Sequence, residues 1–322
     1  MSENLIEIKN MKVSLYNGDD SLQIIREFNL QLNSGEIVGV LGESGSGKTV
    51  SSSMIARIYG ANEGKIDSGT IMFKGTDLAT LSENEMNKIR GKQISYIFQN
   101  PSKALNPYKK VGKQLEDLMK THNIECSKKL ILNAMEEVGL TGVETVYDMF
   151  PFQLSGGQNQ RIMICQSILS KPELLIADEP TSSIDAMLRK KILDLLIKIN
   201  HKYNMAIIFI THDFDVAKYL CERLVIMYGG LVVEEGKIED IFAKPQHPYT
   251  EELIKCAGSL DTKEEYLYSL EGNPPIPAEF EDECPFYNRC KYKVSSCRKQ
   301  IPEMIITEHG KTRCPVRFNK EG

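Results

Sequence analysis

A glycine-rich octapeptide has the residue types that bind phosphate. The residues from Gly42 to Thr49 read GESGSGKT and fit the pattern G-x-x-x-x-G-K-[ST]. Glycines let backbone N–H groups turn towards phosphate oxygens, and the N-terminus of a following helix adds partial positive charge. Lys48 would reach the β- and γ-phosphates, and the Thr49 hydroxyl would ligate Mg²⁺. The alternative is a chance glycine-rich turn that opens a helix. Because the strand, the helix, Lys48 and Thr49 are all in place, the pattern predicts a nucleotide site.

A second acidic element could complete the magnesium site. The segment LLIADEP ends an apolar run with Asp178 and Glu179. Asp178 would hold the metal through water, and Glu179 could polarise the attacking water. A strand that ends in Asp-Glu is by itself often only a solvated terminus. Together with the phosphate loop, the pair favours ATP or GTP chemistry.

Further polar groups follow apolar runs or open a helix. Gln99 follows QISYIF and His212 follows MAIIFIT, so both emerge at the strand ends where an α/β sheet binds ligands. Either residue alone could be structural. LSGGQ contains Ser155, Gly156 and Gly157 at a loop-to-helix junction, which could form another anion-binding helix N-terminus.

The C-terminal tail carries a possible metal site. Residues 284–322 hold Cys284, Cys290, Cys297 and Cys314, which are four of the eight cysteines, and the net charge of this tail is +6. In a reducing compartment such a cluster indicates a metal site before disulfides. The spacing fits one tetrahedral thiolate site for zinc or for an iron–sulfur cluster, and slightly favours zinc. Four unligated cysteines are the alternative. The remaining cysteines are scattered and are expected to be buried or inert.

The elements that must position these residues alternate along the chain. Apolar strands are expected at 5–16, 36–42, 93–98, 173–178 and 205–211, with helices at 128–140 and 189–203 between them. This alternation predicts a mostly parallel α/β sheet. Residues near 100–155 are helix-rich and suggest an inserted helical subdomain. A hairpin is expected at 224–236 with its turn at Gly229–Gly230, and GNPPIPAEF (272–280) reads as a linker.

Composition excludes several classes of protein. The chain is 41% hydrophobic and 26% charged, which is ordinary for globular proteins and excludes collagenous, low-complexity and wholly disordered chains. Its length of 322 residues suggests about two domains. The net charge of −5 argues against bulk binding of polyanions. No apolar run reaches the roughly 18 residues of a membrane span, and the start lacks a signal-peptide core. We therefore expect a soluble protein in the cytoplasm.

With these motifs in hand, nearly the whole chain resembles an ATP-binding subunit of an ABC transporter. GESGSGKT matches the Walker A motif, Gln99 the Q-loop, LSGGQ the signature, LLIADE Walker B and His212 the switch histidine. The resemblance implies a P-loop NTPase fold with an N-terminal antiparallel β subdomain, a helical subdomain at about 100–160 and a small Cys-rich C-terminal extension. It also implies a head-to-tail dimer with ATP between two such domains.

The resemblance assigns roles residue by residue. Glu179, His212 and Gln99 would be catalytic, and Thr49, Gln99 and Asp178 would hold Mg²⁺. Ser155 and Gly157 would contact the γ-phosphate bound to the partner, and Tyr16 would stack on adenine unless it only packs on the sheet. The residues implied to contact nucleotide are Tyr16, Gly42, Ser44, Gly45, Gly47, Lys48, Thr49, Asp178, Ser155, Gly156, Gly157, Gln158 and Asp185.

Further motifs look like the oligopeptide/dipeptide/nickel importer branch. These are FQNPSKALNP (98–107), FPFQLSGGQNQR (150–161), KPQHPYTEELI (244–254) and the four-cysteine tail. Resemblance to this branch implies an ATP-binding domain at 1–258 and an extension at 259–322, and shifts the expected group from zinc to a 4Fe-4S cluster. It favours peptide import, with nickel or metal-chelate import as the alternative.

The resemblance also implies partners. They are a second ATP-binding subunit in a heterodimer, two transmembrane permease subunits and an extracytoplasmic substrate-binding protein, which would place the chain at the cytoplasmic face of the membrane. No nucleic acid is expected. A non-transport ABC ATPase acting on nucleic acid is a remote alternative, since no long insertion separates Walker A from LSGGQ. A small-molecule kinase or a GTPase is also disfavoured, because the N-K-x-D guanine element is missing.

The sequence departs from the branch at three places. TSSID puts Ser183 and Ile184 before Asp185, where the branch carries Ala-Leu-Asp. Asn159 replaces the Arg that commonly follows LSGGQ, and Gln166 replaces Ala in the following helix. None of these changes removes a catalytic group. They bear on packing against the partner and on communication across the dimer.

Overall fold

The computed structural model describes residues 4–18, 20–60, 62–182, 184–258 and 269–317. Its chain forms two compact units. The helical unit comprises Asn33–Glu36 and Thr80–Ile208, and the strand-rich unit comprises Asn4–Leu32, Ile37–Ala79 and the residues from Phe209 onwards. The chain passes from the first to the second within strand β8 (Ala206–Thr211).

Strands of the helical unit form a parallel core. Strand order here is β8–β7–β6, with β6 and β7 parallel and Ile97 opposite Ala177. Every residue of β7 and β8 is buried, as expected of strands covered on both faces. The elements of this unit are α2 (Glu83–Ile89), β6 (Ile94–Ile97), α3 (Pro101–Ala104), α4 (Val111–Thr121), α5 (Lys128–Glu137), α6 (Val143–Asp148), the 3₁₀ turn Pro151–Gln153, α7 (Gly156–Ile168), β7 (Leu174–Asp178) and α8 (Ala186–Tyr203).

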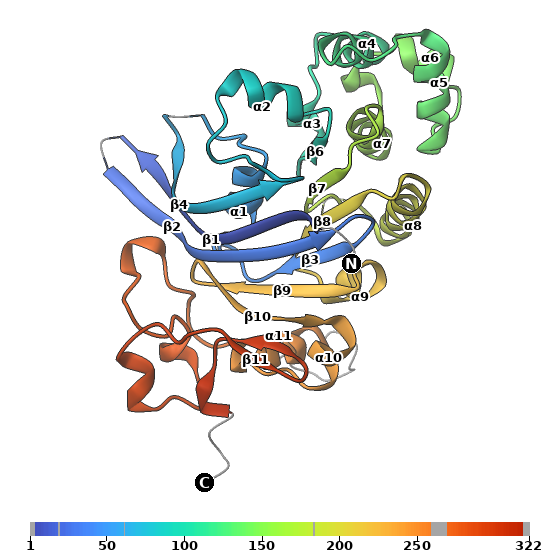
Figure 1. Ribbon diagram of the computed structural model, residues 1–322. Coiled ribbons are helices and arrows are strands. Elements are labelled where there is room, and N and C mark those ends of the chain that lie inside the picture. The colour runs from blue at the N-terminus through green and yellow to red at the C-terminus, as the bar shows by residue number, and fades with distance from the viewer. Residues whose placement is uncertain (1–3, 19, 61, 183, 259–268, 318–322) are drawn as a thin grey trace. The chain divides into compact units, whose positions relative to one another are not determined.

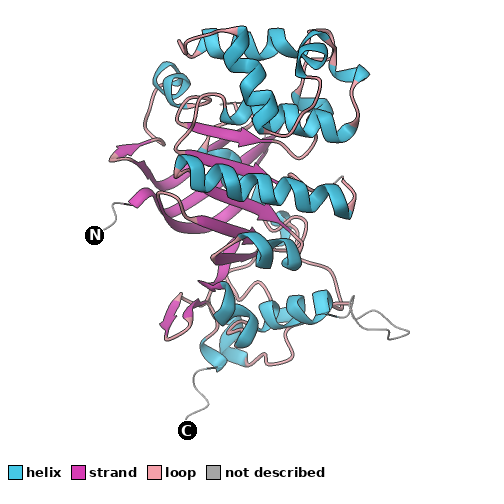
Figure 2. Ribbon diagram, turned by 90° about the vertical axis from the view of Figure 1, so that its right-hand side faces the viewer, coloured by secondary structure: helices cyan, strands magenta, loops and turns pink. Residues whose placement is uncertain are grey.

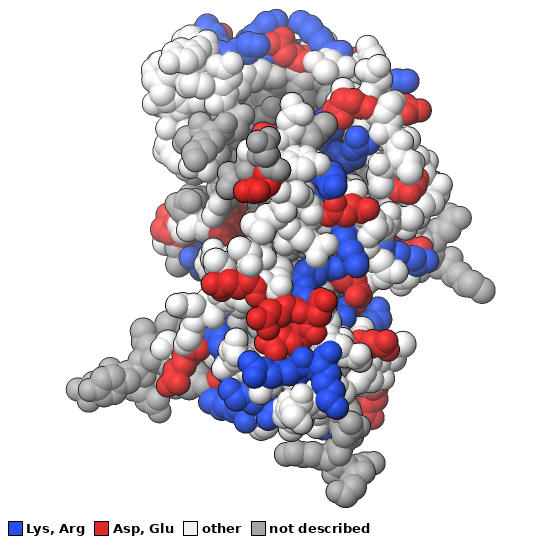
Figure 3. Space-filling view, turned by 90° about the vertical axis from the view of Figure 1, so that its left-hand side faces the viewer, with Lys and Arg blue, Asp and Glu red and all other residues white. Residues whose placement is uncertain are grey.

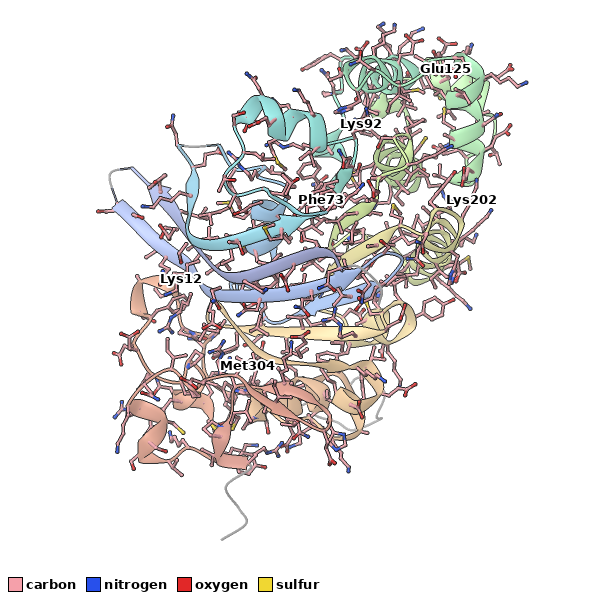
Figure 4. The ribbon with its side chains drawn as sticks, viewed as in Figure 1. Lys12, Phe73, Lys92, Glu125, Lys202 and Met304 are labelled. Atoms are coloured by element: carbon pink, nitrogen blue, oxygen red, sulfur yellow. The ribbon has the colours of Figure 1, made fainter. Side chains whose placement is uncertain are left out.

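Helices α4, α5, α6 and α7 pack together, as Figure 1 shows (green). The apolar positions that repeat along α4 and α5 face inwards, including Leu115 and Ile131, which are fully buried. At the end of α8, the Lys202 ammonium, labelled in Figure 4, donates a 2.7 Å hydrogen bond to Glu137 of α5. The helix-rich region expected near 100–160 is therefore present.

The strand-rich unit is mostly antiparallel. Its strand order is β5–β4–β1–β2–β10–β9–β3, in which β3 pairs in parallel with β9 and β10 with β2. Its elements are β1 (Asn4–Asn17), β2 (Asp20–Asn33), β3 (Ile37–Leu41), α1 (Lys48–Ile55), β4 (Gly64–Phe73), β5 (Thr76–Asp77), α9 (Phe214–Leu220), β9 (Arg223–Tyr228), β10 (Leu231–Lys237), α10 (Ile238–Ala243) and α11 (Pro248–Gly258). The expectation of a mostly parallel sheet is thus wrong for this unit, where long hairpin strands add antiparallel edges.

Two antiparallel pairings define this unit. Ile6 of β1 lies opposite Phe73 of β4, labelled in Figure 4, and both are buried. The expected hairpin is confirmed: β9 and β10 flank Gly229 and Gly230, whose φ angles of 54° and 74° suit a two-residue turn.

The C-terminal segment after α11 belongs to the strand-rich unit. Figure 2 shows it mainly as loops with short helical turns and the small hairpin of β11 (Ile305–Thr307) and β12 (Gly310–Thr312). β12 pairs with β10, where Thr312 lies opposite Glu234. The expected linker at 272–280 is irregular apart from the 3₁₀ turn Pro277–Glu279. The expected domain boundary at 258/259 adjoins residues 259–268, which lie outside the described residues.

Candidate functional site

The phosphate loop connects β3 to α1 in the strand-rich unit. Gly47 caps α1 in a left-handed conformation (φ 102°), and a Cβ there would approach the Ile25 side chain to 2.5 Å. Gly45 also has a positive φ of 81°, but a Cβ there would meet open space. Only glycine takes both conformations readily. The loop therefore turns its backbone at the start of a helix, as an anion-binding cradle requires.

Polar groups in this loop are held ready for a ligand. The Lys48 ammonium is buried and donates 2.8 Å hydrogen bonds to the carbonyl oxygens of Gly42 and Glu43. The buried Ser46 hydroxyl makes no hydrogen bond within the described part of the chain. Ser44, Gly45 and Thr49 are exposed, so the loop is open to solvent. A buried cation and an unpaired buried hydroxyl fit a bound phosphate group.

Tyr16 and His212 lie in the same unit as the loop. Tyr16 is half-buried near the end of β1, and its N–H donates to the carbonyl of Glu63 at 3.0 Å. His212 is exposed directly after β8. The next residue, Asp213, caps α9 by accepting from the N–H groups of Asp215 and Val216.

The helical unit brings two of the sequence-predicted residues into contact. Gln99 follows β6 and Glu179 follows β7, and the Gln99 Nε2 donates a 3.0 Å hydrogen bond to Glu179 Oε2. Glu179 has a φ of 44°, which is uncommon for a residue with a side chain and is often found at functional sites. Asp178 is buried, and its Oδ2 accepts a 3.1 Å hydrogen bond from the Tyr96 hydroxyl.

Tyr96 was missed from the sequence, although a signal was present. A half-buried tyrosine near the end of a strand favours a partner for its hydroxyl, and Asp178 ends the neighbouring strand at the same edge. Gln160 was missed as well. It is buried in α7, and its Nε2 donates a 2.7 Å hydrogen bond to the carbonyl of Pro180, just after the acidic pair.

The signature segment begins α7 as expected. Ser155 is the N-cap: its hydroxyl accepts from the Gln158 N–H at 3.3 Å, and the Gln158 side chain accepts from the Ser155 N–H at 2.9 Å. This reciprocal capping fixes the start of the helix. Ser155 and Gly156 are exposed, and a Cβ at Gly156 would meet no atom. At Gly157 a Cβ would approach Leu188 to 2.6 Å.

One of the departures has a structural explanation. Asn159 is buried and donates a 3.0 Å hydrogen bond to the carbonyl of Pro151, which ties α7 to the turn before it. Asp185 caps α8 by accepting from the Leu188 N–H at 2.9 Å. Ser183 lies outside the described residues. Nothing in the structure explains Gln166.

The expected nucleotide residues fall in both units. The phosphate loop, Tyr16 and His212 belong to the strand-rich unit, whereas Gln99, Asp178, Glu179 and residues 155–158 belong to the helical unit. The expected magnesium ligands are divided in the same way, with Thr49 in one unit and Gln99 and Asp178 in the other. The structure brings together Gln99 with Glu179 and Lys48 with the loop, each within its own unit.

The four C-terminal cysteines line one pocket. Its cavity volume is only about 20 Å³, or about 350 Å³ when the open solvent at its mouth is counted, and its lining includes Cys284, Cys290, Cys297, Cys314 and the buried Phe286. Burial raises the pKa of the Cys284 thiol to about 12, and the three neighbouring thiols add to the effect. Within the described ranges, no group of three or more His, Cys, Asp or Glu side chains is arranged to hold a metal ion. The cysteines thus gather as expected, but not as a compact site for one ion.

The basic residues of this segment are largely neutralised by carboxylates of the same unit. On the face that Figure 3 presents, acidic and basic side chains lie next to one another. Among the described residues after 284, six Lys and Arg side chains form ion pairs: Arg289–Glu43, Lys291–Glu252, Arg298–Glu283, Lys311–Glu235, Arg313–Glu27 and Arg317–Glu251. Such pairing argues against a surface that attracts nucleic acid by charge.

The described helices include none long and apolar enough to cross a membrane. A phosphate loop, an acidic pair after a parallel strand and a capped signature helix together define a P-loop ATPase of the ABC type. The profile of the ABC transporter family matches residues 25–182, and that of the oligopeptide/dipeptide transporter C-terminal region matches residues 233–297.

Curated relatives agree over most of the chain. It is 40% identical to the oligopeptide transport ATP-binding protein OppD of Bacillus subtilis, covering 94% of this chain and 85% of that protein. It is 36% identical to OppD of Haemophilus influenzae, with 96% of each chain covered, and 34% identical to the dipeptide transport ATP-binding protein DppD of the same organism, over 99% and 97%. The chain belongs to this family of ATP-binding subunits of ABC transporters, and it is an ATPase.

Solved structures agree on the fold. The dimeric ATP-binding cassette MJ0796, in a post-hydrolysis state bound to ADP and phosphate, has a TM-score of 0.64 at 28% identity, covering 72% of this chain and 98% of that one. CbiO1 of Clostridium perfringens, part of the transporter complex CbiONQ, has a TM-score of 0.63 at 26% identity, over 75% and 91%. The ABC cassette fold expected from the motifs is confirmed.

Proposed function

We propose that this chain is the ATP-hydrolysing subunit that energises an importer of oligopeptides or dipeptides. The observation that carries the proposal is the match of residues 233–297 to the C-terminal region of oligopeptide/dipeptide transporters, together with relatives named for peptide transport. Nickel or metal-chelate import is the alternative. Residues 1–258 act as the ATP-binding domain and 259–322 as its extension.

The ATP site uses the residues described above. Lys48 and the loop N–H groups would bind the β- and γ-phosphates, and Thr49, Gln99 and Asp178 would hold Mg²⁺, as the resemblance to the family implies. Glu179 accepts the proton of the attacking water, and in-line displacement at the γ-phosphorus releases ADP. The burial of Lys48, the unpaired Ser46 hydroxyl and the contact of Gln99 with Glu179 support these roles. His212 senses the γ-phosphate, and Tyr16 stacks on adenine.

Hydrolysis takes place in a dimer. The exposed residues Ser155 and Gly156 at the start of α7 are available for the nucleotide held by a second ATP-binding subunit, and Gly157, Gln158 and Asp185 contribute to the same contact. That second subunit is a different chain, so the pair is a heterodimer. ATP binding closes it, and hydrolysis with product release reopens it. Two permease subunits supply the path, and an extracytoplasmic binding protein delivers substrate. The chain then works at the cytoplasmic face of the membrane.

The four cysteines of the C-terminal pocket would hold a 4Fe-4S cluster. Four thiols that line one pocket are the donor set that such clusters use. Zinc bound by the same four thiolates is the alternative. When bound, the cluster would offset part of the negative charge of the thiolates and fix the extension.

Anaerobic purification tests the cluster. We expect about four iron and four sulfide per chain, and loss of both in Cys290→Ser. Cys126→Ser is the matched control, because Cys126 lies in the loop between α4 and α5 of the helical unit and does not line the cysteine pocket. One zinc per chain and no iron would overturn the assignment of the cluster in favour of zinc.

The ATPase activity of the reconstituted transporter tests the proposed function in peptide import. ATPase activity is measured with the permease subunits in vesicles while the binding protein delivers either short peptides or nickel chelates. Stimulation by peptides supports the proposal, and stimulation by nickel chelates alone would move the chain to metal import. Glu179→Gln serves as the inactive reference.

A further inference from the structure

The second residue of the phosphate loop is held by the C-terminal extension. The Glu43 carboxylate accepts two hydrogen bonds from the Arg289 guanidinium, at 2.6 Å from Nη1 and 3.1 Å from Nη2. The Arg289 side chain is only 5% exposed, against 26% for Glu43. Bidentate pairs of this kind are strong and fix geometry. A residue 246 positions further along the chain therefore anchors the loop.

Arg289 itself is fixed on its remaining sides. Its Nε donates to the carbonyl of Glu271 at 2.9 Å, its Nη2 to that of Leu270 at 3.3 Å, and its Nη1 also to the Tyr228 hydroxyl at 3.1 Å. A guanidinium with partners on every edge loses little further freedom when it binds a carboxylate. The Arg289 guanidinium is thus preorganised to bind the Glu43 carboxylate.

The backbone of Glu43 is held as well. Its N–H donates a 2.8 Å hydrogen bond to the hydroxyl of Tyr249, a fully buried residue of α11 whose ring lies 4.4 Å from that of Tyr228. The carbonyl of Glu43 accepts from the Lys48 ammonium at 2.8 Å. One residue therefore joins Arg289 and Tyr249 to the lysine that reaches for phosphate.

We propose that Arg289 and Tyr249 are positioning residues for ATP. Tyr249 holds the backbone of the phosphate loop in its binding shape, and Arg289 holds and neutralises the Glu43 carboxylate, which would otherwise be an unpaired negative charge on a loop that must accept an anion. An unpaired Glu43 would repel the phosphates, because like charges in a partly buried site interact more strongly than in water. This inference rests on the proposed ATP site, and it gives the extension a role in nucleotide binding.

The test measures the affinity of the purified full chain for Mg²⁺ and the non-hydrolysable analogue AMP-PNP by calorimetry. We expect Arg289→Gln to raise Kd about tenfold, corresponding to the loss of one hydrogen-bonded charge pair. Adding Glu43→Gln to that variant should restore most of the affinity, because the repelling charge is then gone. Simple structural damage would not be repaired by a second substitution. Tyr249→Phe should raise Kd about threefold.

Arg298→Gln is the matched control, because Arg298 pairs with Glu283 in the same extension at 3.3 Å. Its Kd should equal that of the unaltered chain, with thermal unfolding followed for every variant. An unchanged Kd in a folded Arg289→Gln, or a double variant as weak as the single one, would overturn the proposal. If Arg289→Gln does not fold, an unchanged Kd in Tyr249→Phe would overturn the proposal instead. Failure of the unaltered chain to bind AMP-PNP would instead refute the ATP site itself.

Discussion

Gln99 Nε2 lies 3.0 Å from Glu179 Oε2, so the amide that follows one strand donates a hydrogen bond to the carboxylate that follows the next. Parallel pairing of β6 with β7 makes this contact, since it places the ends of the two strands at one edge. The bond orients Glu179, whose backbone already has an uncommon positive φ. In its proposed role as the base, Glu179 would lose less freedom when it aligns a water molecule, because Gln99 already holds it.

Glu179→Gln should abolish turnover while ATP still binds. The amide cannot accept the proton of the attacking water, and the loss of a general base costs about 10²–10⁴-fold in rate. The dimer should live longer because ATP is no longer consumed. ATPase rates of the reconstituted transporter and size-exclusion chromatography with ATP measure both effects. Glu136→Gln on the exposed face of α5 is the control for charge. Near-normal turnover would exclude Glu179 as the base.

Tyr96→Phe should weaken the response to Mg²⁺. The substitution removes the hydrogen bond to Asp178 Oδ2 and leaves the ring in place. Groups that orient a metal ligand in this way are worth about 10–100-fold in metal affinity. We expect the Mg²⁺ concentration for half-maximal ATPase activity to rise at least about tenfold with little change in the maximal rate. Tyr108→Phe is the control, because Tyr108 is 91% exposed. Equal Mg²⁺ curves for the two variants would contradict the role of Tyr96.

Much of the site follows from local sequence. GESGSGKT lies between a buried strand and a helix, and LSGGQ begins a helix with Ser155 as its cap, as the sequence predicted. Such features are recognisable because a turn, a cap and a buried strand depend on nearby residues. The contact of Gln99 with Glu179 could also have been predicted, because the carboxyl ends of neighbouring parallel strands meet at one edge of the sheet.

The strand pairings and contacts that could not be predicted from the sequence join residues that are far apart in the chain. β2 and β4 were not predicted separately, because polar residues interrupt their alternation and their pairing with β1 and β10 is decided by the whole sheet. Arg289 could be recognised only as part of a cysteine motif. Its bond to Glu43 joins residues far apart in the chain, and no local pattern encodes that contact.

Tyr147 should titrate late in alkali. Burial raises its pKa to about 12, and its hydrogen bond to the Glu116 carboxylate adds to the effect. Because the folded pKa lies above the ordinary value of about 10, its contribution to stability is complete below pH 10 and is lost as pH rises towards 12. Absorbance of phenolate during a pH titration should show one tyrosine fewer at high pH in Tyr147→Phe. That variant should lose about 1.5 kcal/mol of stability at pH 7.

The outcome that contradicts this prediction is specific. If Tyr147→Phe removes a tyrosine that ionises near pH 10, then the phenol is not held by Glu116.

The two glycines of the signature should respond to alanine in opposite ways. Gly156→Ala adds a methyl group that meets no atom of this chain, and alanine favours a helix over glycine by up to about 1 kcal/mol. Its thermal stability should therefore be equal or higher. If Gly156 faces the nucleotide of the partner, the same methyl group blocks closure, and ATP-driven dimerisation and turnover should fall at least about tenfold.

Gly157→Ala should act first on stability, because its methyl group would approach Leu188 of α8 to 2.6 Å. Overpacking of this kind costs about 1–3 kcal/mol. Adding Leu188→Ala should recover part of the loss, whereas it should leave the turnover of Gly156→Ala unchanged. Thermal unfolding of the isolated chain and ATPase activity of the complex separate the two effects. Full turnover in Gly156→Ala would show that this end of α7 does not meet the partner's nucleotide. The proposed dimer with ATP between the two subunits would then have to be abandoned.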